Sequence, residues 1–199
     1  MSSIESRSYL ALVHYPVYDK NQKIVATSIT NLDIHDIARS SKTYGLAGYF
    51  LVHPVAAQRE LAQRIIGHWQ TGPGQEQNDF RSDALSIVRI TESIEQTIEQ
   101  ITLEHNARPL IVATSARDSA GAVSAATLLR DPRLADRPLL LVFGTGWGLT
   151  QQWSQGVDKF LCPVRGRVAY NHLSVRSAAG IILDRLFAQP EPNSGEHSL

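Results

Sequence analysis

The chain has 199 residues, with 19 Lys and Arg against 19 Asp and Glu and a formal net charge of zero. An apolar fraction of 43% and a charged fraction of 19% are typical of a folded globular protein and exclude wholesale disorder. Apolar runs such as Pro138–Phe143 are far shorter than the roughly 20 residues of a membrane span. The single cysteine excludes an internal disulfide, and no charged-then-apolar leader opens the chain. We therefore expect a cytoplasmic protein without membrane attachment.

Short apolar runs rich in branched residues predict the strands. They lie at Tyr9–Val17, Gly48–Pro54, Ala84–Ile90, Pro109–Thr114, Pro138–Phe143 and Val157–Pro163. Several are apolar on both faces, which suits central strands of a parallel sheet. Helical spacing separates them, as in Ala57, Leu61, Ile65 and Trp69, and in Ile94, Ile98 and Ile101. This alternation predicts an α/β fold: a parallel-rich sheet of about six strands with helices on both faces.

Polar residues mark the expected helix starts. Asp33 is a candidate N-cap for a helix over Ile34–Tyr44, and Asn171 for the last helix, which runs to Phe187. Ser93 and Gln96 have the spacing of a capping box. The last helix is apolar over most of its girth, so we expect it to pack against the sheet and against a second subunit.

We expect a single domain over residues 1–188. Residues 70–82 form a long, polar, glycine-rich stretch without periodicity, which indicates a loop, either a functional lid or simply a mobile segment. Residues 189–199 have nothing to bury and are expected to be disordered.

Three glycines follow the fifth predicted strand at alternate positions: Gly144, Gly146 and Gly148. Such glycines permit left-handed turns and close approach of a ligand to the backbone, or they form a plain turn. Their spacing differs from the G-x-G-x-x-G fingerprint of dinucleotide-binding folds, which lies in the first βαβ unit. A nucleoside-like cofactor bound here would therefore be held by the C-terminal third of the domain.

The next segment carries the most specific pattern. Pro163 and Gly166 are followed by Ser174 and an apolar helix. This order resembles the last motif of the SPOUT superfamily, which comprises S-adenosylmethionine-dependent RNA methyltransferases with a C-terminal trefoil knot. The match has two departures, since His172 stands at the family's asparagine and Asn171 is displaced by one position.

Two earlier segments are similar to the family's other motifs. Gly144–Gly148 resembles the middle motif without its acidic residue. Asp33–Arg39 resembles the first motif, with Asp33 and His35 in place of asparagine and glycine. The resemblance spans residues 9–187 and is strongest to a small bacterial group related to tRNA guanine-N1 methyltransferases. It implies that the fold ends in a trefoil knot.

The resemblance also implies a cofactor, S-adenosylmethionine (SAM), held largely by backbone groups of three loops and the start of the last helix. Carried over to this sequence, the cofactor-binding residues are Thr114, Ser115, Gly144, Thr145, Gly146, Gly148, Leu161, Cys162, Pro163, Gly166, Asn171, Leu173 and Ser174. For Cys162 we favour a small buried apolar side chain over a nucleophile.

Three residues are candidates for catalysis. Arg39 takes the place of the family's first-motif arginine, which contacts phosphate or the acceptor, often across a dimer interface; alternatively it is an exposed arginine paired with Asp36. Asp33 is a candidate general base, with helix capping as the alternative. His172 is a candidate proton shuttle or a structural histidine. The histidines lack metal-ligand spacing, so we expect no metal.

The resemblance implies a SAM-dependent methyltransferase acting on structured RNA, tRNA or rRNA, at guanine N1 or a ribose 2′-oxygen, as a homodimer joined through the C-terminal helix. An alternative is a SPOUT-like module that binds SAM or RNA and has lost catalysis, because Asp33, His35 and His172 depart from the pattern. A flavodoxin-like nucleotide-binding regulator fits the α/β alternation but leaves residues 163–178 unexplained.

The zero net charge argues against binding nucleic acid by bulk electrostatics alone. Charge is nevertheless unevenly distributed along the chain. Basic residues crowd the expected cofactor segment: Lys159, Arg165, Arg167, Arg176 and Arg185. We therefore expect RNA binding to be local, in a basic cleft on a neutral particle.

Overall fold

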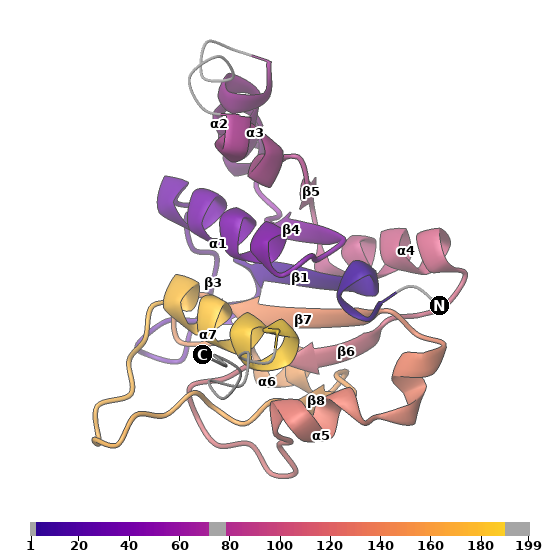
Figure 1. Ribbon diagram of the computed structural model, residues 1–199. Helices are drawn as coiled ribbons and strands as arrows, with labels where there is room; N and C mark the ends of the chain where they lie inside the picture. Colours follow the sequence, from indigo (N-terminus) through magenta and orange to yellow (C-terminus); the bar gives the residue numbers. More distant parts are fainter. Residues whose placement is uncertain (1–2, 72–78, 190–199) are drawn as a thin grey trace, which may run out of the picture.

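The computed structural model describes residues 3–71 and 79–189. Six parallel strands form the main sheet, in the order β5-β4-β1-β7-β6-β8 (Figure 1). They are β1 (Ser8–Val13), β4 (Gly48–Val52), β5 (Val88–Thr91), β6 (Leu110–Ala113), β7 (Leu139–Gly144) and β8 (Lys159–Phe160). Strands β2 (Val17–Tyr18) and β3 (Ile24–Val25) form a separate antiparallel pair. The predicted α/β fold is confirmed.

Helices connect the strands. They are α1 (Asn31–Thr43), α2 (Ala56–Gln70), α3 (Asp79–Leu85), α4 (Ile94–His105), α5 (Ala125–Leu129), α6 (Gln151–Ser154) and α7 (Val175–Phe187), with 3-10 turns η1 (Glu5–Arg7) and η2 (Pro132–Ala135). The predicted cap of α4 is confirmed, since Ser93 Oγ accepts a hydrogen bond from Gln96 N at 3.2 Å. No helix in the described residues is long and apolar enough to cross a membrane.

Both faces of the sheet are buried. Leu10 and Leu12 of β1 belong to a core that α1, α5 and α7 cover, and α1 and α7 lie side by side in Figure 1. Tyr9, Ala11 and Val13 point to the other face, where α4 and residues near α6 complete a second core. Because successive strand side chains alternate between two buried faces, the central strands read as continuous apolar runs.

One predicted strand begins too early. Ala84 and Leu85 are the buried last residues of α3, and β5 begins only at Val88. The apolar run continues from the helix end towards the strand, and periodicity cannot separate the two in so short a segment. The first predicted strand also divides, because β1 ends at Val13 and β2 begins at Val17.

Two predicted helix caps are wrong. Thr30 caps α1, with its Oγ1 accepting from Asp33 N at 3.2 Å, so Asp33 lies inside the first turn. Ser174 caps α7 by accepting from Ser177 N at 3.2 Å. Asn171 lies three residues before that cap and donates its amide to a distant carbonyl instead. In both cases a hydroxyl group three residues from the predicted cap accepts a hydrogen bond from a backbone N–H of the first helical turn.

Parts of the sequence predictions lie outside the described residues. Of the predicted loop over residues 70–82, Gln70 closes α2 and residues 79–82 open α3, while residues 72–78 are not described. Residues 190–199 are not described either, so the disordered tail and the domain end at 188 stay predictions. The trefoil knot also stays a prediction.

The capping correction can be measured as stability. Ser174→Ala removes the acceptor at the start of α7 and should lower the free energy of unfolding by about 1 kcal/mol. Asn171→Ala removes only a hydrogen bond to a loop carbonyl and should cost less. Urea unfolding of both variants tests this order, and a larger loss for Asn171→Ala would contradict it.

Candidate functional site

Adjacent strands β1 and β7 send the chain to opposite faces of the sheet. After β1 the chain forms α1, whose Ile34 and Ile37 pack in one core, and after β7 it forms α6, whose Trp153 packs against the other. In a parallel sheet this divergence leaves a crevice beyond the carboxyl ends of the strands. A cavity of about 1230 Å³ lies there. It exceeds the roughly 300–1,000 Å³ of a typical ligand pocket, so it has room for a cofactor and part of a second molecule.

The structure brings most of the predicted site residues to this cavity. Those that line it are Asp33, Thr114, Ser115, Gly144, Thr145, Gly146, Gly148, Asn171, His172, Leu173 and Ser174. The residues outside its lining are Arg39, Leu161, Cys162, Pro163 and Gly166. The carboxyl ends of β6 and β7 therefore supply the cavity wall, together with the segment before α7. Residues 161–163 directly after β8 are not part of the lining, although Phe160 and Val164 on either side are.

The predicted burial of Cys162 is wrong. Leu161 is 4% exposed and pairs through a parallel bridge with Val123, whereas Cys162 is exposed. The two side chains point in opposite directions, as successive residues of extended chain do. Leu161 therefore takes the core position and Cys162 faces solvent.

The glycine loop after β7 is held against β2. Trp147 N donates to Tyr18 O and Tyr18 N donates to Gly148 O, both at 2.9 Å. Gly146 and Gly148 have φ of 58° and 101°, in the region that glycine adopts without strain. A Cβ on Gly146 would lie 2.9 Å from Tyr18 O. The loop conformation therefore requires glycine at Gly146, and the hairpin β2–β3 fixes it.

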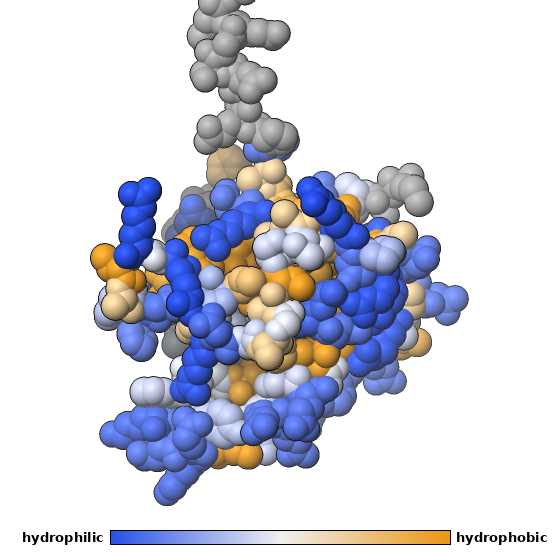
Figure 2. All heavy atoms as spheres, turned by 90° about the horizontal axis from the view of Figure 1, so that it is seen from below, coloured by the Kyte–Doolittle hydropathy of each residue, from blue (hydrophilic) through white to orange (hydrophobic). Residues whose placement is uncertain are grey.

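Two loops below the sheet in Figure 1 are tied together. Asn171 Nδ2 donates to Ala116 O at 2.9 Å, and Arg165 forms an ion pair with Asp118. On the face seen from below in Figure 2, hydrophobic side chains are exposed in the middle and hydrophilic ones surround them. These contacts join the loop after β6 to the segment before α7 and close one side of the cavity.

A buried carboxylate links α1 to α7 at the cavity. Asp33 Oδ1 lies 2.9 Å from Arg176 Nη1, and the Asp33 side chain is only 8% exposed. Thr30 Oγ1 donates to Asp33 Oδ2 at 2.7 Å. Arg176 Nε also lies 3.3 Å from Asp36 Oδ2. Because both oxygens of Asp33 have partners, the carboxylate is an anchor in this arrangement, and a role as general base stays a prediction.

Two arginines line the cavity, Arg117 and Arg176, and neither is among the site residues that the sequence predicts. Arg39 is exposed on α1 and makes no ion pair with a described residue; its expected partner Asp36 pairs with Arg176 instead. The position of Arg176 in the sequence could have identified it as a site residue, because it lies two residues after the motif residue Ser174. His172 is exposed and contacts the Tyr170 ring edge-on at 5.3 Å.

Some of the basic residues expected to form the cleft are paired with acids. Lys159 pairs with Asp131 and Arg165 with Asp118, so part of the positive charge is neutralised. Arg117 lines the cavity, and Arg167 lies in the neighbouring segment. Both are exposed and make no ion pair with a described residue.

A buried histidine lies beneath the glycine loop. His14 is fully buried, and its Nδ1 lies 3.1 Å from Thr27 Oγ1, which in turn hydrogen-bonds Thr145 Oγ1. His53 lies beside it, with ring centroids 5.6 Å apart. Burial, and then the charge of His53, lower the pKa of His14 to about 4. His14 is therefore neutral at physiological pH and supports the cavity wall through Thr27 and Thr145.

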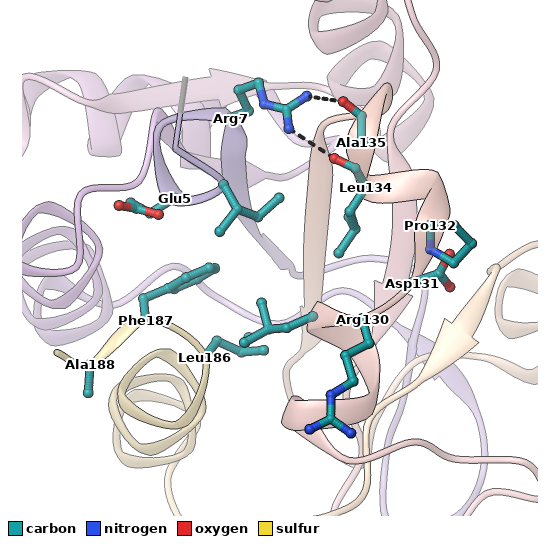
Figure 3. Close-up of a pocket in the computed structure, with 12 residues that line it drawn as sticks. Glu5, Arg7, Arg130, Asp131, Pro132, Leu134, Ala135, Leu186, Phe187 and Ala188 are labelled. Atoms are coloured by element: carbon teal, nitrogen blue, oxygen red, sulfur yellow. Dashed lines mark hydrogen bonds between the residues drawn. The ribbon is translucent and has the colours of Figure 1, made fainter. Parts of the chain in front are cut away.

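A second hollow, of about 520 Å³, lies near the amino end of β1. Figure 3 shows Leu134, Leu186 and Phe187 along it, with Arg7 donating to Leu134 O at 2.9 Å and to Ala135 O at 3.2 Å. Arg7 thus serves to fix η2 against the start of β1. The larger cavity at the carboxyl ends of the strands is the position where ligands bind in open parallel sheets, so we take it as the candidate site.

Comparison with known families agrees with this geometry. A family described as "SAM-dependent RNA methyltransferase" matches residues 7–188. The chain belongs to this family. The resemblance to SPOUT RNA methyltransferases is confirmed by this match together with the solved structures below.

The chain covers different shares of the length of two relatives. The tRNA (guanine-N(1)-)-methyltransferase of Nitratidesulfovibrio vulgaris is 46% identical over 178 residues, which are 89% of this chain but 41% of that protein. An uncharacterized protein of Aquifex aeolicus is 40% identical over 186 residues, 94% of this chain and 91% of that protein. The chain therefore spans less than half of the named methyltransferase.

Solved structures share the fold. The SpoU methyltransferase AviRb from Streptomyces viridochromogenes, in complex with the cofactor AdoMet, has a TM-score of 0.55 at 16% identity, over 92% of this chain and 57% of that one. The TrmH/SpoU tRNA-modifying enzyme of A. aeolicus has a TM-score of 0.53 at 16% identity, over 90% and 72%. At this identity the likeness concerns the fold alone.

The buried His14 makes stability depend on pH. In the unfolded chain it protonates near its ordinary pKa of 6.5, whereas the folded protein holds it neutral to a pKa of about 4. The unfolded state then binds more protons between these values, so stability falls as pH falls. From pH 7 to pH 5 the free energy of unfolding should drop by about 2 kcal/mol through this group.

Urea unfolding at the two pH values measures this loss. His14→Asn should remove most of the difference, whereas His172→Asn, on an exposed residue, should keep the wild-type slope. Equal slopes in all three proteins would contradict the assignment.

Proposed function

We propose that this protein transfers a methyl group from SAM to structured RNA, tRNA or rRNA, at guanine N1 or a ribose 2′-oxygen. The observation that carries the proposal is the cavity at the point where β1 and β7 diverge. Its walls are the glycine loop, the loop after β6 and the start of α7. The resemblance assigns these segments to SAM, together with a third loop over residues 161–166, most of which lies outside the lining.

The cavity suits SAM chemically. Apolar side chains such as Leu149, Phe160 and Ile182 offer a slot for an adenine ring, and Thr114 and Ser115 offer hydroxyls. A Cβ on Gly148 would meet nothing within 4 Å, so the loop backbone is open to close approach there. Residues of the glycine loop and the start of α7 would hold the cofactor.

When bound, SAM would supply an electrophilic methyl group: transfer to the acceptor atom breaks the S–CH₃ bond, leaves S-adenosylhomocysteine and releases the acceptor's proton. The chain's contribution is to align the acceptor with the S–CH₃ bond and to shield both from water. Asp33 and Arg176 fix the α1 side of the cavity. His172 is exposed at the cavity, where it is the candidate to take the acceptor proton.

The proposal includes a homodimer joined through α7 and a cytoplasmic location. Arg39 lies outside the cavity of its own chain, on the exposed side of α1, which packs against α7. If Arg39 contacts the acceptor, it does so in the cavity of the partner subunit. This supports a site completed across the dimer.

A SPOUT-like module without catalysis is the second candidate. Both oxygens of Asp33 are engaged by Arg176 and Thr30, which leaves the motif without a free carboxylate base. Calorimetry with SAM and tritium transfer from labelled SAM to total RNA separate the two. The enzyme binds and transfers, and a module that binds SAM does so without transfer. Absence of SAM binding at millimolar ligand would contradict both and leave only a module that binds RNA.

Two glycines offer a matched pair of variants. Gly146→Ala places a Cβ 2.9 Å from Tyr18 O and should weaken SAM binding at least about tenfold by displacing the loop backbone. Gly67→Ala, in α2 and outside the cavity lining, meets nothing within 4 Å and should leave the Kd within about twofold. Calorimetry measures both, and equal affinity of the two variants would contradict a site built on Gly146.

A further inference from the structure

Trp147 is an unusual residue at the mouth of the cavity. Its side chain lines the cavity, and the residue is 54% exposed. Its ring makes no aromatic or cation contact with another residue in the described part of the chain. Large aromatic rings normally bury most of their surface, and exposed rings at clefts are typical of binding sites.

The backbone holds this ring in place. Trp147 N donates to Tyr18 O and Gly148 N donates to Thr145 O, at 2.9 and 3.1 Å. The left-handed Gly146 and Gly148 flank it on both sides. The half-exposed ring therefore projects from a loop whose backbone is fixed on both sides. Such preorganisation lowers the entropy lost when a partner binds.

The cavity that Trp147 lines also carries side chains that fit a nucleotide. His172, which is in ring contact with Tyr170 at 5.3 Å, lines the same cavity from the segment before α7. Arg117 also lines it, exposed and without an ion pair to a described residue. Aromatic rings that stack on bases, combined with basic side chains for phosphates, are the means by which proteins bind unpaired nucleotides.

The exposure of Trp147 distinguishes the acceptor from the cofactor. A small cofactor is enclosed on most sides in such sites, and the apolar side chains of Phe160 and Ile182 in the lining would hold its adenine. A ring that is 54% exposed lies on the solvent side, where a macromolecule enters. We propose that the Trp147 ring stacks on the base of the acceptor nucleotide. This inference rests on the proposed methyltransferase function and names the residue that positions its RNA.

The test compares Trp147→Ala, Trp147→Phe and a control, Phe80→Ala. Phe80 is 90% exposed on α3 and does not line the cavity. Calorimetry gives the Kd for SAM, and tritium transfer to bulk tRNA and rRNA from a strain lacking the gene gives kcat and KM. Trp147→Ala should raise the KM for RNA about tenfold or more, with the Kd for SAM within about twofold. Trp147→Phe should recover most of the loss, and Phe80→Ala should match the wild type.

Each other outcome has a definite meaning. If the wild type transfers no methyl group to RNA, the proposed function fails. If it does, and Trp147→Ala keeps the wild-type KM or loses SAM affinity to the same extent, stacking on the acceptor is overturned. The same holds if Trp147→Phe is as defective as Trp147→Ala, because the aromatic face would then not be the property that matters.

Discussion

The ion pair between Asp33 and Arg176 is the contact on which the site depends. It joins residues 143 positions apart, one in the first turn of α1 and one in the first turn of α7. The Asp33 side chain is only 8% exposed, so removal of Arg176 would leave a mostly buried carboxylate without its partner, which is strongly destabilising. The pair thus holds the last helix to the first one beside the cavity.

The rest of the cavity follows from this anchor and from the order of the strands. Strand β8 has only two residues, so the chain beyond it is held mainly by loop contacts. The pair Arg165–Asp118 and the amide of Asn171 hold that segment to the loop after β6. With α7 fixed at its start, three loops distant in sequence meet at the carboxyl ends of β6 and β7.

The sequence predicted those elements whose pattern lies within a single helix or strand. Continuous apolar runs predicted the strands, and four-residue spacing predicted α2 and α4, because both patterns are local. Caps were harder to predict: Thr30 and Ser174 compete with Asp33 and Asn171 within one turn, and all four residue types are good caps. The choice depends on where the helix packs.

Long-range pairing accounts for the remaining differences. Nothing near Arg39 in the sequence reveals that Asp36 pairs with Arg176 of another helix. The exposure of Cys162 follows from its neighbour Leu161 entering the core beside Val123. The charge pairing near the site also depends on the fold. Lys159 pairs with Asp131, 28 positions away, and Arg165 pairs with Asp118, 47 positions away. The proposed RNA binding would therefore use a few side chains at one cavity.

The central claim is that this cavity binds the cofactor through the glycine loop. A crystal structure with S-adenosylhomocysteine tests it most directly. The account predicts ligand density at the carboxyl ends of β6 and β7, in contact with the backbone of residues 144–148. Density in the hollow beside Arg7 and Phe187, or a ligand bound away from the glycine loop, would contradict it.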